Sequence, residues 1–375
     1  MRIGIDVSWA QGPPSGTATY IQGLVEALVR LGTQHEWILF ERGQSAGRGR
    51  ALPEVAARNV SRAVVDAPLT NLRQQVTLPL ALRRRHLDLY HSPAFFLPLA
   101  WRGPSVVSMF DLNFLRLREN WQPGRRRAYL SLALQAPLAA RQAGRIITLS
   151  QASADDLARL LRVPRRKITV IPGAPRRLFF QPPAPDELQT RLGCRGRFLL
   201  SVGVLAPQKN LERLLRAFAT IGEPDLGLVM VGPEAGGYAN EVLRPLIGRL
   251  GLAGRVTLAG RLDDVALRAL YHTAVALVFP SLAEGFGLPI VEAMACGCPV
   301  ITSAISSMPE VAGDAALLVN PYDTAALAGT MDRVLSSPEL RADLAERGRR
   351  RAALFTWDQA ALQTLRCYDE AVTDR

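Results

Sequence analysis

Two glutamates, Glu284 and Glu292, stand eight residues apart, and neither has the pattern of a solvated surface charge. The apolar run Ala274–Pro280 before them predicts a buried parallel strand. A short helix is predicted after that strand, with Pro289 at its first position and Gly297 just past its end. Glu284 is therefore expected in the loop at the carboxyl end of a strand, and Glu292 is expected about one turn into the following helix.

The turn between these glutamates has the chemistry of an anion site. Gly285 and Gly287 allow close backbone approach or a positive φ angle, which residues with a Cβ resist. Free amides at the helix start and the helix dipole favour a bound anion, and the two carboxylates can accept hydrogen bonds from hydroxyls. A nucleotide-sugar presents this combination of phosphate and hydroxyls. The alternative is a plain Gly-x-Gly turn with a glutamate that only satisfies the dipole.

A second segment, Ser201–Asn210, combines a strand end with a cation. Gly203 turns the chain, and Lys209 is predicted at the start of an amphipathic helix. A lysine there opposes the helix dipole, so we expect an anionic partner such as a diphosphate; a solvated lysine is the alternative. The loop Gly12–Gly16 resembles a phosphate-binding turn but matches neither common glycine-rich motif, which leaves a plain turn equally open.

The elements that must position these residues alternate between strand and helix patterns along the chain. Helices are predicted near 17–31, 70–84, 121–143, 151–162, 209–219, 239–250 (kinked or shifted by Pro245), 263–273, 289–296 and 323–336. Strands are predicted at Ile3–Val7, Trp37–Phe40, Leu87–His91, Ser105–Phe110, Ile146–Leu149, Ile168–Ile171, Phe198–Val202, Leu226–Val231, Val256–Ala259, Ala276–Phe279, Val300–Ser303 and Ala316–Val319.

This alternation predicts α/β domains with parallel, doubly wound sheets, whose ligands bind beyond the carboxyl ends of the strands. The proline-rich stretch Pro172–Pro185 lacks periodicity and indicates a boundary. We expect an N-terminal Rossmann-like domain over residues 1–175, a linker over 176–196, a C-terminal Rossmann-like domain over 197–355, and a helix over 356–375 that returns to the first domain. Two such domains facing each other would share a cleft.

The composition is typical of a globular protein long enough for two domains, with 375 residues of which 48% are hydrophobic. The sequence has no run of about 18 apolar residues, so we expect no membrane span. A strand pattern begins at Arg2, so we expect no signal peptide. The four cysteines form no C-x-x-C pair. We expect them reduced and buried in a cytoplasmic protein.

The charge is uneven along the chain. Residues 1–180 carry 26 Lys and Arg against 11 Asp and Glu, whereas residues 181–375 carry 19 against 22. A one-sided field favours an anionic partner, such as a membrane surface that would hold the protein peripherally on its inner face, or a lipid-linked phosphate. Solvated arginines in a generally basic chain are the alternative. Nucleic acid is not expected, because the basic clusters lack interleaved aromatics.

Several motifs together resemble glycosyltransferase family 4, whose members are retaining enzymes of the GT-B fold. The motifs are S-V-G-x-L-x-P-x-K-N-L from residue 201, V-x-L-x-G ahead of D-D-x-x-L-x-x-L-Y, and E-G-F-G-L-P-I-V-E-A-M-A-C-G-x-P-V from residue 284. An N-terminal G-x-x-x-Y-x-x-x-L-V-x-A-L helix, D-L-Y-H-S-P and F-T-W-D fit the same family. The resemblance covers nearly the whole chain.

The resemblance implies a role for each matching residue. Glu284 would contact hydroxyls of the donor sugar, Glu292 would bind the ribose hydroxyls, and Lys209 would neutralise the departing diphosphate. The amides of residues 286–288 would face the sugar and diphosphate, residue 16 would let a loop close over the phosphates, and the base would lie near residues 260–262. The remaining donor-binding positions implied in this way are Gly16, Gly203, Gly260, Leu262, Gly285, Phe286, Gly287 and Leu288.

The chain departs from the family pattern at two places. Gln208 and Val204 stand where the family usually has a phosphate-binding arginine. Phe110-Asp111 stands where it often has His-Asp, so we assign these two residues to the acceptor side, with Asp111 also a catalytic candidate. His91 ends the neighbouring strand and is either a partial substitute or a histidine hydrogen-bonded locally. No D-x-D pair occurs and the histidines are scattered, so neither a metal nor a cofactor is expected.

The sequence therefore predicts a retaining, metal-independent glycosyltransferase. It would move a hexose such as mannose from a GDP- or UDP-linked donor to a glycan or a polyprenyl-diphosphate-linked acceptor, in cell-surface polysaccharide or glycoconjugate synthesis. One alternative is a degenerate relative that binds nucleotide-sugar or glycan without transfer. Another is a different GT-B enzyme, such as an epimerase or a phosphorylase.

Overall fold

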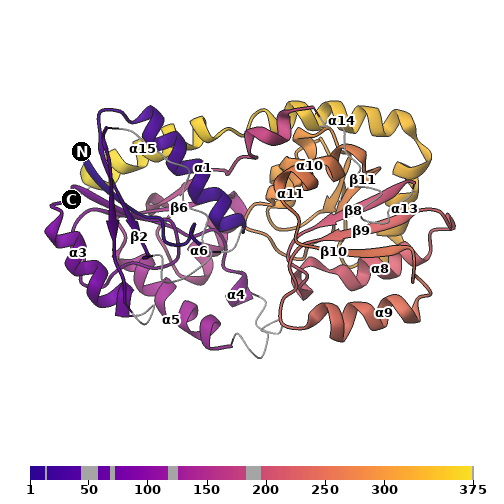
Figure 1. Cartoon of the computed structure of the whole chain (residues 1–375), viewed down its shortest axis with the longest axis horizontal. Helices are drawn as coiled ribbons and strands as arrows, with labels where there is room; N and C mark the ends of the chain where they lie inside the picture. The colour runs from indigo at the N-terminus through magenta and orange to yellow at the C-terminus, as the bar shows by residue number, and fades with distance from the viewer. Residues whose placement is uncertain (13–14, 44–57, 68–71, 117–125, 183–195, 374–375) are drawn as a thin grey trace. The chain divides into compact units, whose positions relative to one another are not determined.

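The computed structural model describes residues 1–12, 15–43, 58–67, 72–116, 126–182 and 196–373. Two compact units divide the chain: unit 1 is Met1–Ala174 with Thr356–Arg375, and unit 2 is Pro175–Phe355 (Figure 1). The predicted linker is described as far as residue 182, and this part belongs to unit 2. Its 3₁₀ helix η6 (Arg177–Phe180) buries Phe179 edge-on against the Tyr271 ring, with centroids 5.8 Å apart.

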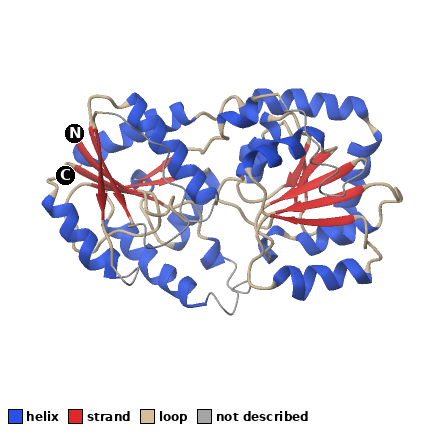
Figure 2. Ribbon diagram, viewed as in Figure 1, coloured by secondary structure: helices blue, strands red, loops and turns tan. Residues whose placement is uncertain are grey.

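The sheet of unit 1 is parallel and has the strand order β3-β2-β1-β4-β5-β6-β7. Helices cover both of its faces (Figure 2), which is why β2 is a continuous apolar run rather than an alternating one. The order reverses between β1 and β4, the place where ligands bind in such sheets. The strands are β1 (Arg2–Asp6), β2 (Glu36–Glu41), β3 (Val60–Val64), β4 (Leu89–Ser92), β5 (Ser105–Ser108), β6 (Arg145–Thr148) and β7 (Ile168–Val170).

The helices of unit 1 begin at side-chain caps where the caps are described. The Ser15 hydroxyl accepts from the Ala18 amide at the start of α1, and Ser150 accepts from Ser153 at the start of α6. The helical segments are α1 (Gly16–Leu31), the π-helical turn η2 (Arg73–Thr77), α3 (Leu78–Arg84), α4 (Asn113–Arg116), α5 (Arg126–Gln142), α6 (Gln151–Leu160), the 3₁₀ turn η5 (Arg165–Lys167) and α15 (Trp357–Thr373).

Helix α15 completes unit 1 by packing on α1, although the two are separated by most of the sequence. A Cβ at Gly23 of α1 would lie 2.2 Å from Cε2 of Trp357, so the indole occupies the space that a side chain there would need. Tyr20 packs edge-on against the same ring, with centroids 5.7 Å apart, and Arg30 pairs with Asp358. The contact is therefore shaped to one aromatic side chain.

The sheet of unit 2 is also parallel, in the order β10-β9-β8-β11-β12-β13. Both sheets are thus doubly wound, and the predicted fold class is confirmed. In this sheet the order reverses between β8 and β11. The strands are β8 (Phe198–Val202), β9 (Gly227–Val231), β10 (Val256–Gly260), β11 (Ala276–Phe279), β12 (Val300–Ser303) and β13 (Leu317–Val319).

The helices of unit 2 follow the predicted pattern except around Pro245 and at α12, which was not predicted. A π-helical turn precedes α9, and Pro245 is the second residue of that helix, where no backbone donor is needed. The helical segments are η7 (Pro207–Lys209), α8 (Leu211–Ala219), η8 (Ala239–Leu243), α9 (Arg244–Arg249), α10 (Asp264–Thr273), α11 (Leu288–Ala295), α12 (Met308–Ala312), α13 (Thr324–Ser336) and α14 (Pro338–Ala352).

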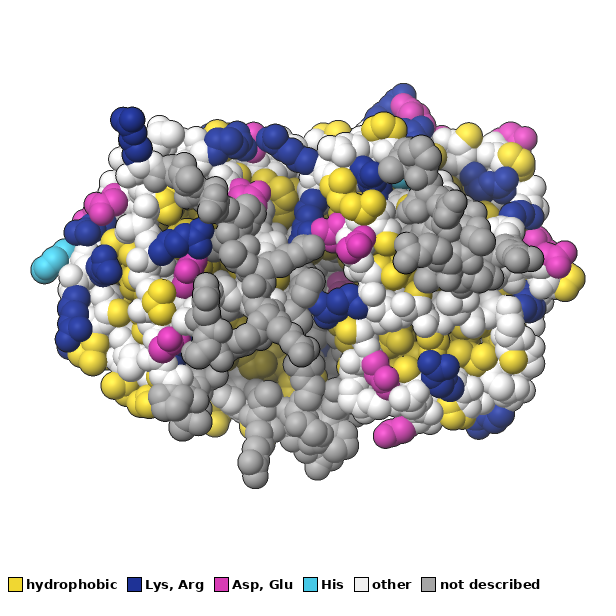
Figure 3. Space-filling model, in the orientation of Figure 1, with side chains coloured by type: hydrophobic (Ala, Val, Ile, Leu, Met, Phe, Trp, Pro, Cys, Tyr) yellow, Lys and Arg dark blue, Asp and Glu magenta, His cyan; other side chains and the backbone are white. Residues whose placement is uncertain are grey.

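The positive charge of the chain belongs to unit 1. Unit 1 has 26 Lys and Arg against 15 Asp and Glu, a net charge of +11, and unit 2 has 19 against 18, a net charge of +1. On the face of unit 1 seen in Figure 3 the basic side chains are spread out rather than gathered into one patch. Within the described ranges, no helix is both long and apolar enough to cross a bilayer.

Candidate functional site

The candidate site of unit 2 lies where β8 and β11 end. These strands are parallel neighbours, so their carboxyl ends meet at one edge of the sheet, at the point where the strand order reverses. The chain leaving β8 carries Lys209, and the chain leaving β11 carries Glu284. Two of the predicted catalytic residues are thus brought to the place where a doubly wound sheet binds its ligand.

Lys209 and Glu284 are hydrogen-bonded partners. The Lys209 Nζ donates to Oε1 of Glu284 at 2.5 Å, and it lies 4.7 Å from the centroid of the Phe279 ring. The two side chains keep only 13% and 16% of their exposure. Because water screens this pair less than a surface pair, its opposite charges attract each other more strongly.

Glycines make room for the lysine stem. Gly203, just after β8, has a φ of +148°, and a Cβ there would lie 2.9 Å from Lys209 Cε. A Cβ at Gly232, after β9, would come within 1.8 Å of the Gly203 carbonyl oxygen. The Gly232 amide in turn donates to the carbonyl of Gly260 at 2.8 Å. Close approach of the ends of β8 and β9 therefore requires glycine at 232, and the positive φ favours glycine at 203.

The position of Lys209 differs from the prediction by a short turn. Lys209 ends η7, and Asn210 adopts a left-handed conformation with φ +57° before α8 begins at Leu211. The side-chain Nδ2 of Asn210 donates to the carbonyls of Pro280 and Pro321 at 3.1 and 2.7 Å, which fixes this turn to the neighbouring loops. Lys209 thus precedes the helix, and Glu284 supplies the anionic partner that we expected a diphosphate to provide.

Two serines that the sequence analysis missed hold the Glu284 loop. The Ser306 hydroxyl accepts from the Glu284 amide at 3.2 Å, and both Ser306 and Ser307 lie within 3.1 Å of the Glu284 carbonyl. Ser307 also lies 2.9 Å from the carbonyl of Phe286. Ser306 has a φ of +60°, an unusual conformation for serine. These contacts orient the loop, and only the fold places residues 306–307 beside residue 284.

Glu292 is buried on α11 and has one side-chain partner among the described residues. The Tyr271 hydroxyl donates to Oε2 of Glu292 at 3.2 Å. Burial raises the pKa of Glu292 to about 7, while the Tyr271 hydrogen bond and the charge of Arg176 oppose that rise. Glu292 is therefore a carboxyl group that changes charge near neutral pH.

The start of α11 lies beside the same aromatic ring as Lys209. Gly287 precedes the helix with φ +107°, and a Cβ there would lie 3.9 Å from Phe279 Cε1. Pro289 is the second residue of α11 rather than the first. Phe286 is buried and packs edge-on against Phe355. Phe279 thus links the ammonium to the amide end of the helix, where an anion is favoured.

The remaining predicted donor residues occupy strand ends and helix starts. Gly260 ends β10 with φ +65°, and Leu262 is half-buried in the loop before α10. Gly285 is buried in the Glu284 loop, and Leu288 opens α11. In unit 1, Gly16 is the exposed first residue of α1. The preceding residues 13–14 lie outside the described ranges.

His91, which the sequence leaves as either a partial acceptor-side substitute or a locally hydrogen-bonded histidine, lies in the core of unit 1. The ring is fully buried, with Nδ1 2.6 Å from the Tyr368 hydroxyl and Nε2 2.9 Å from the Ser108 hydroxyl. Burial lowers the pKa of His91 to about 3, which keeps the ring neutral. Both nitrogens are occupied, so the alternative of a locally bonded histidine is what the structure shows.

Phe110 also belongs to the core rather than to a binding surface. Its ring packs edge-on against Tyr20 and Phe95, with centroids 4.8 and 6.2 Å away. Asp111 follows it in the loop after β5, half-buried, and its Oδ1 accepts from the Asn113 amide at 2.8 Å at the start of α4. A carboxylate beyond the carboxyl end of a central strand remains in a position to meet a substrate, so the role of Asp111 stays a prediction.

The described cysteines are buried, and the described residues form no metal-ligand group. Cys296, Cys298 and Cys367 are free and buried, and Cys194 lies outside the described residues. Burial raises the pKa of each of the three described thiols. Within the ranges that the structure describes, no three His, Cys, Asp or Glu side chains are grouped as metal ligands would be. The need for a metal stays untested by this arrangement.

Two family models match the chain in succession. The model described as Glycosyltransferase Family 4 matches residues 14–174, and the model described as Glycosyl transferases group 1 matches residues 189–351. The two matches follow the two units, and the second contains the Lys209, Glu284 and Glu292 segments.

Curated relatives include two mannosyltransferases. The chain is 31% identical over 298 residues to the O-antigen chain mannosyltransferase B of Escherichia coli, covering 77% of this chain and 76% of that protein. It is 35% identical over 312 residues to the MMP alpha-(1->4)-mannosyltransferase of Mycolicibacterium hassiacum, covering 78% and 73%.

Solved structures share the fold over the full length. Sucrose-phosphate synthase from Thermosynechococcus elongatus superposes with a TM-score of 0.80 at 23% identity, covering all of both chains. WaaG, a glycosyltransferase involved in lipopolysaccharide biosynthesis, gives 0.74 at 16% identity, covering 97% and 98%. HepE from Anabaena, in complex with UDP and glucose, gives 0.73 at 20% identity, covering 98% of each chain.

Proposed function

The chain belongs to glycosyltransferase family 4, and we propose that it transfers mannose from a nucleoside-diphosphate sugar to a hydroxyl of a glycan or lipid-linked acceptor. The observation that carries this proposal is the sheltered Lys209–Glu284 pair at the switch point of the unit 2 sheet, beside the start of α11. Mannose is favoured over other hexoses because the two relatives above are mannosyltransferases.

The costly event in such a transfer is the build-up of negative charge on the departing diphosphate. The Lys209 ammonium has three N–H donors, of which Glu284 takes one. We propose that the others, with the amides at the start of α11, bind the diphosphate oxygens. A preorganised cation and helix amides stabilise that charge most where water is scarce. An ammonium in this role would let the transfer proceed without a metal.

We propose retention of the anomeric configuration. The acceptor oxygen forms its bond to the anomeric carbon on the face from which the diphosphate leaves, and the acceptor proton passes to the departing phosphate oxygen. Glu284 would accept hydrogen bonds from sugar hydroxyls and stabilise positive charge at the anomeric carbon while holding Lys209 in place. Glu292, one turn into α11, would accept from the ribose hydroxyls in its charged form.

The substitution Glu284→Gln tests the site. We expect transfer to fall about 100-fold or more, because the carboxylate that both orients the sugar and anchors Lys209 is lost, while circular dichroism and thermal unfolding stay close to wild type. Transfer is measured with GDP-mannose, UDP-glucose and dTDP-glucose on a panel of glycan acceptors. The matched control is Glu241→Gln, an exposed glutamate of the same unit. Wild-type turnover by Glu284→Gln would remove the assignment.

We further propose that unit 1 docks on an anionic lipid surface, which a lipid-linked acceptor would require. Unit 1 carries the excess positive charge. Its helix α5 exposes three leucines one helical turn apart, Leu130, Leu134 and Leu138, with 53%, 71% and 43% of their surface accessible. Apolar side chains on a helix of a basic unit suit the boundary between lipid headgroups and acyl chains, and vesicle flotation tests this.

A further inference from the structure

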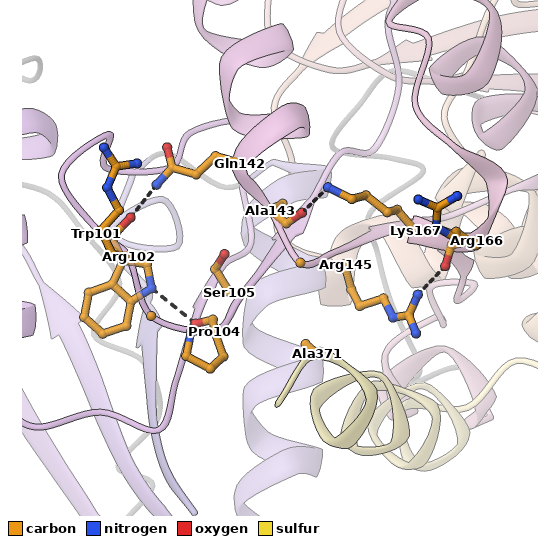
Figure 4. A pocket seen from close by; sticks show the side chains of 12 residues that line it. Trp101, Arg102, Pro104, Ser105, Gln142, Ala143, Arg145, Arg166, Lys167 and Ala371 are labelled. Carbon is orange, nitrogen blue, oxygen red and sulfur yellow. Dashed lines mark hydrogen bonds between the residues drawn. The ribbon is translucent and has the colours of Figure 1, made fainter. Parts of the chain in front are cut away.

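Unit 1 has a cavity of about 500 Å³ that the proposed transfer does not use. Figure 4 shows it lined on one side by the Trp101–Ser105 turn and on the other by Arg145, Arg166 and Lys167. The end of α5 at Gln142 and Ala371 of α15 complete the wall. The volume falls within the range of small-molecule sites, roughly 300–1,000 Å³.

The cavity lies at the opposite edge of the sheet from the carboxyl ends. Ser105 opens β5, Arg145 opens β6, and Lys167 directly precedes β7. All three strands are parallel, so these residues gather at the amino ends. Asp111 lies beyond the other end of β5. The cavity is therefore separate from the edge where unit 1 would meet an acceptor.

Four cationic side chains line this cavity: Arg102, Arg145, Arg166 and Lys167. Among the described residues, Glu370 lies with them, and its Oε2 is 3.3 Å from Nε of Arg145. Lys167 donates to the carbonyls of Arg141 and Ala143 at 3.2 and 2.9 Å, which are neutral acceptors. Burial, and then the charges of Arg166 and Arg145, lower the pKa of Lys167.

We propose that this cavity binds a small phosphate-bearing anion, of the size of diphosphate or a sugar phosphate. Guanidinium groups bind phosphate through paired N–H donors, and a lysine adds a compact charge. Such a ligand would place negative charge among the four cations of the described wall. The site is distinct from the donor site proposed in unit 2, because every lining residue belongs to unit 1.

Some residues that line the cavity also stabilise the fold of unit 1, so they are unsuitable for substitution. Lys167 holds the last carbonyls of α5, and Arg145 holds the Arg166 carbonyl and Glu370, so their removal would loosen the unit. Arg102 and Arg166 are both exposed. The double substitution Arg102→Gln/Arg166→Gln therefore removes two charges from the mouth of the cavity while keeping the interactions of Lys167 and Arg145.

Isothermal titration of the full chain with inorganic diphosphate tests the proposal. The titration is run in low salt with saturating GDP or UDP, so that a donor site is filled beforehand. We expect the wild type to bind a further diphosphate, and the double variant to bind it about tenfold more weakly or worse, since each lost bond to a charged group removes substantial affinity. The matched control is Arg58→Gln/Arg84→Gln, which removes two exposed arginines outside the cavity.

A second arm identifies the source of the phosphate. Flotation with phosphatidylglycerol vesicles is compared between the same three proteins. Loss of binding that is confined to the cavity variant, in either arm, supports the site. Binding of diphosphate indicates that the ligand is a free phosphate compound. Binding of vesicles without binding of diphosphate indicates a lipid headgroup. Equal binding of both probes by the wild type and the cavity variant would overturn the proposal. So would equal losses in the cavity variant and the control, because net charge alone would then explain them.

Discussion

Glu292 is the acid whose surroundings most change its chemistry. It lies buried on α11 with the Tyr271 hydroxyl as its side-chain partner, and burial raises its pKa to about 7. In the role proposed for it, the charged form would offer more acceptors to the ribose hydroxyls than the neutral form. Donor affinity should therefore fall as the pH falls below 7.

The same residue predicts a dependence of stability on pH. The folded state holds the Glu292 proton up to about pH 7 and the unfolded chain only up to about 4.5, so the folded state binds more protons between these values. The free energy of unfolding should thus fall as pH rises through this window, by roughly 3 kcal/mol in all. Glu292→Gln should remove that loss, making the variant more stable than the wild type at pH 8 and equal to it near pH 4.5.

Urea unfolding of the unliganded protein at both pH values measures this effect, and donor titration at pH 8 should show weaker binding by the variant. Asp332→Asn, which neutralises an exposed acid of the same unit, is the control. If the free energy of unfolding changed with pH in the same way for the wild type and Glu292→Gln, Glu292 would not have the raised pKa.

The sequence identified Lys209 and Glu284 as site residues but not as partners. Their types and positions after strands could be predicted, because strand ends and helix starts are local patterns. Their direct bond spans 75 positions and depends on how two loops fold. The same limit explains why Ser306, Ser307 and Tyr271 were missed and why the two interpretations of His91 stayed open, since burial and hydrogen-bond partners are set by distant segments.

At the scale of elements, the contact of α15 with the rest of unit 1 is its most specific feature. Tyr368 of α15 is fully buried and brings its hydroxyl within 2.6 Å of His91 Nδ1 on β4. Trp357 fills the space left by Gly23 on α1. Helix α15 therefore packs against α1 and supplies a buried polar partner to β4, although both elements lie far earlier in the sequence.

Tyr368→Phe should destabilise unit 1 by roughly 1–3 kcal/mol, because it leaves a buried ring nitrogen of His91 without its partner. Urea unfolding at pH 7 with a probe in unit 1 measures it. Tyr322→Phe is the control, since Tyr322 is 61% exposed. Equal stability of Tyr368→Phe and wild type would mean that water replaces the hydroxyl or that the bond contributes little.

Most strands and helices could be predicted because apolar runs and helical periodicity are local. The missed elements include β3, α4 and α12, and two of them show the physical reason. The edge strand β3 has the sequence VSRAV, whose charge and exposed positions resemble a loop, and α12 has only five residues with Pro309 near its start. The prediction for 239–250 found the helix but not its π-helical turn, which forms where Pro245 withholds a donor.

At the scale of the molecule, charge and exposed leucines combine on unit 1 and predict a salt-sensitive attachment to lipid. The protein should float with phosphatidylglycerol vesicles at low salt and much less at high salt, since screening weakens attraction between separated charges. Leu134→Gln should reduce flotation, because that side chain is 71% exposed on α5. Flotation with neutral and anionic vesicles alike, or with neither, would contradict the prediction.

The matched control for flotation is Leu354→Gln, an equally apolar exposed position of unit 2 with 58% of its surface accessible. An equal effect of both substitutions would point to general hydrophobicity rather than to α5.

The return of α15 to unit 1 also bears on the order in which the protein is made. During synthesis the ribosome releases residues 1–174 first, yet Tyr20, Gly23 and His91 lack their cover until residues 357–368 emerge. Unit 2 is contiguous in sequence and can close around its own core while translation continues. Unit 2 would thus complete its folding before unit 1. A stop codon upstream of Trp357 would leave unit 1 without the helix that covers these residues.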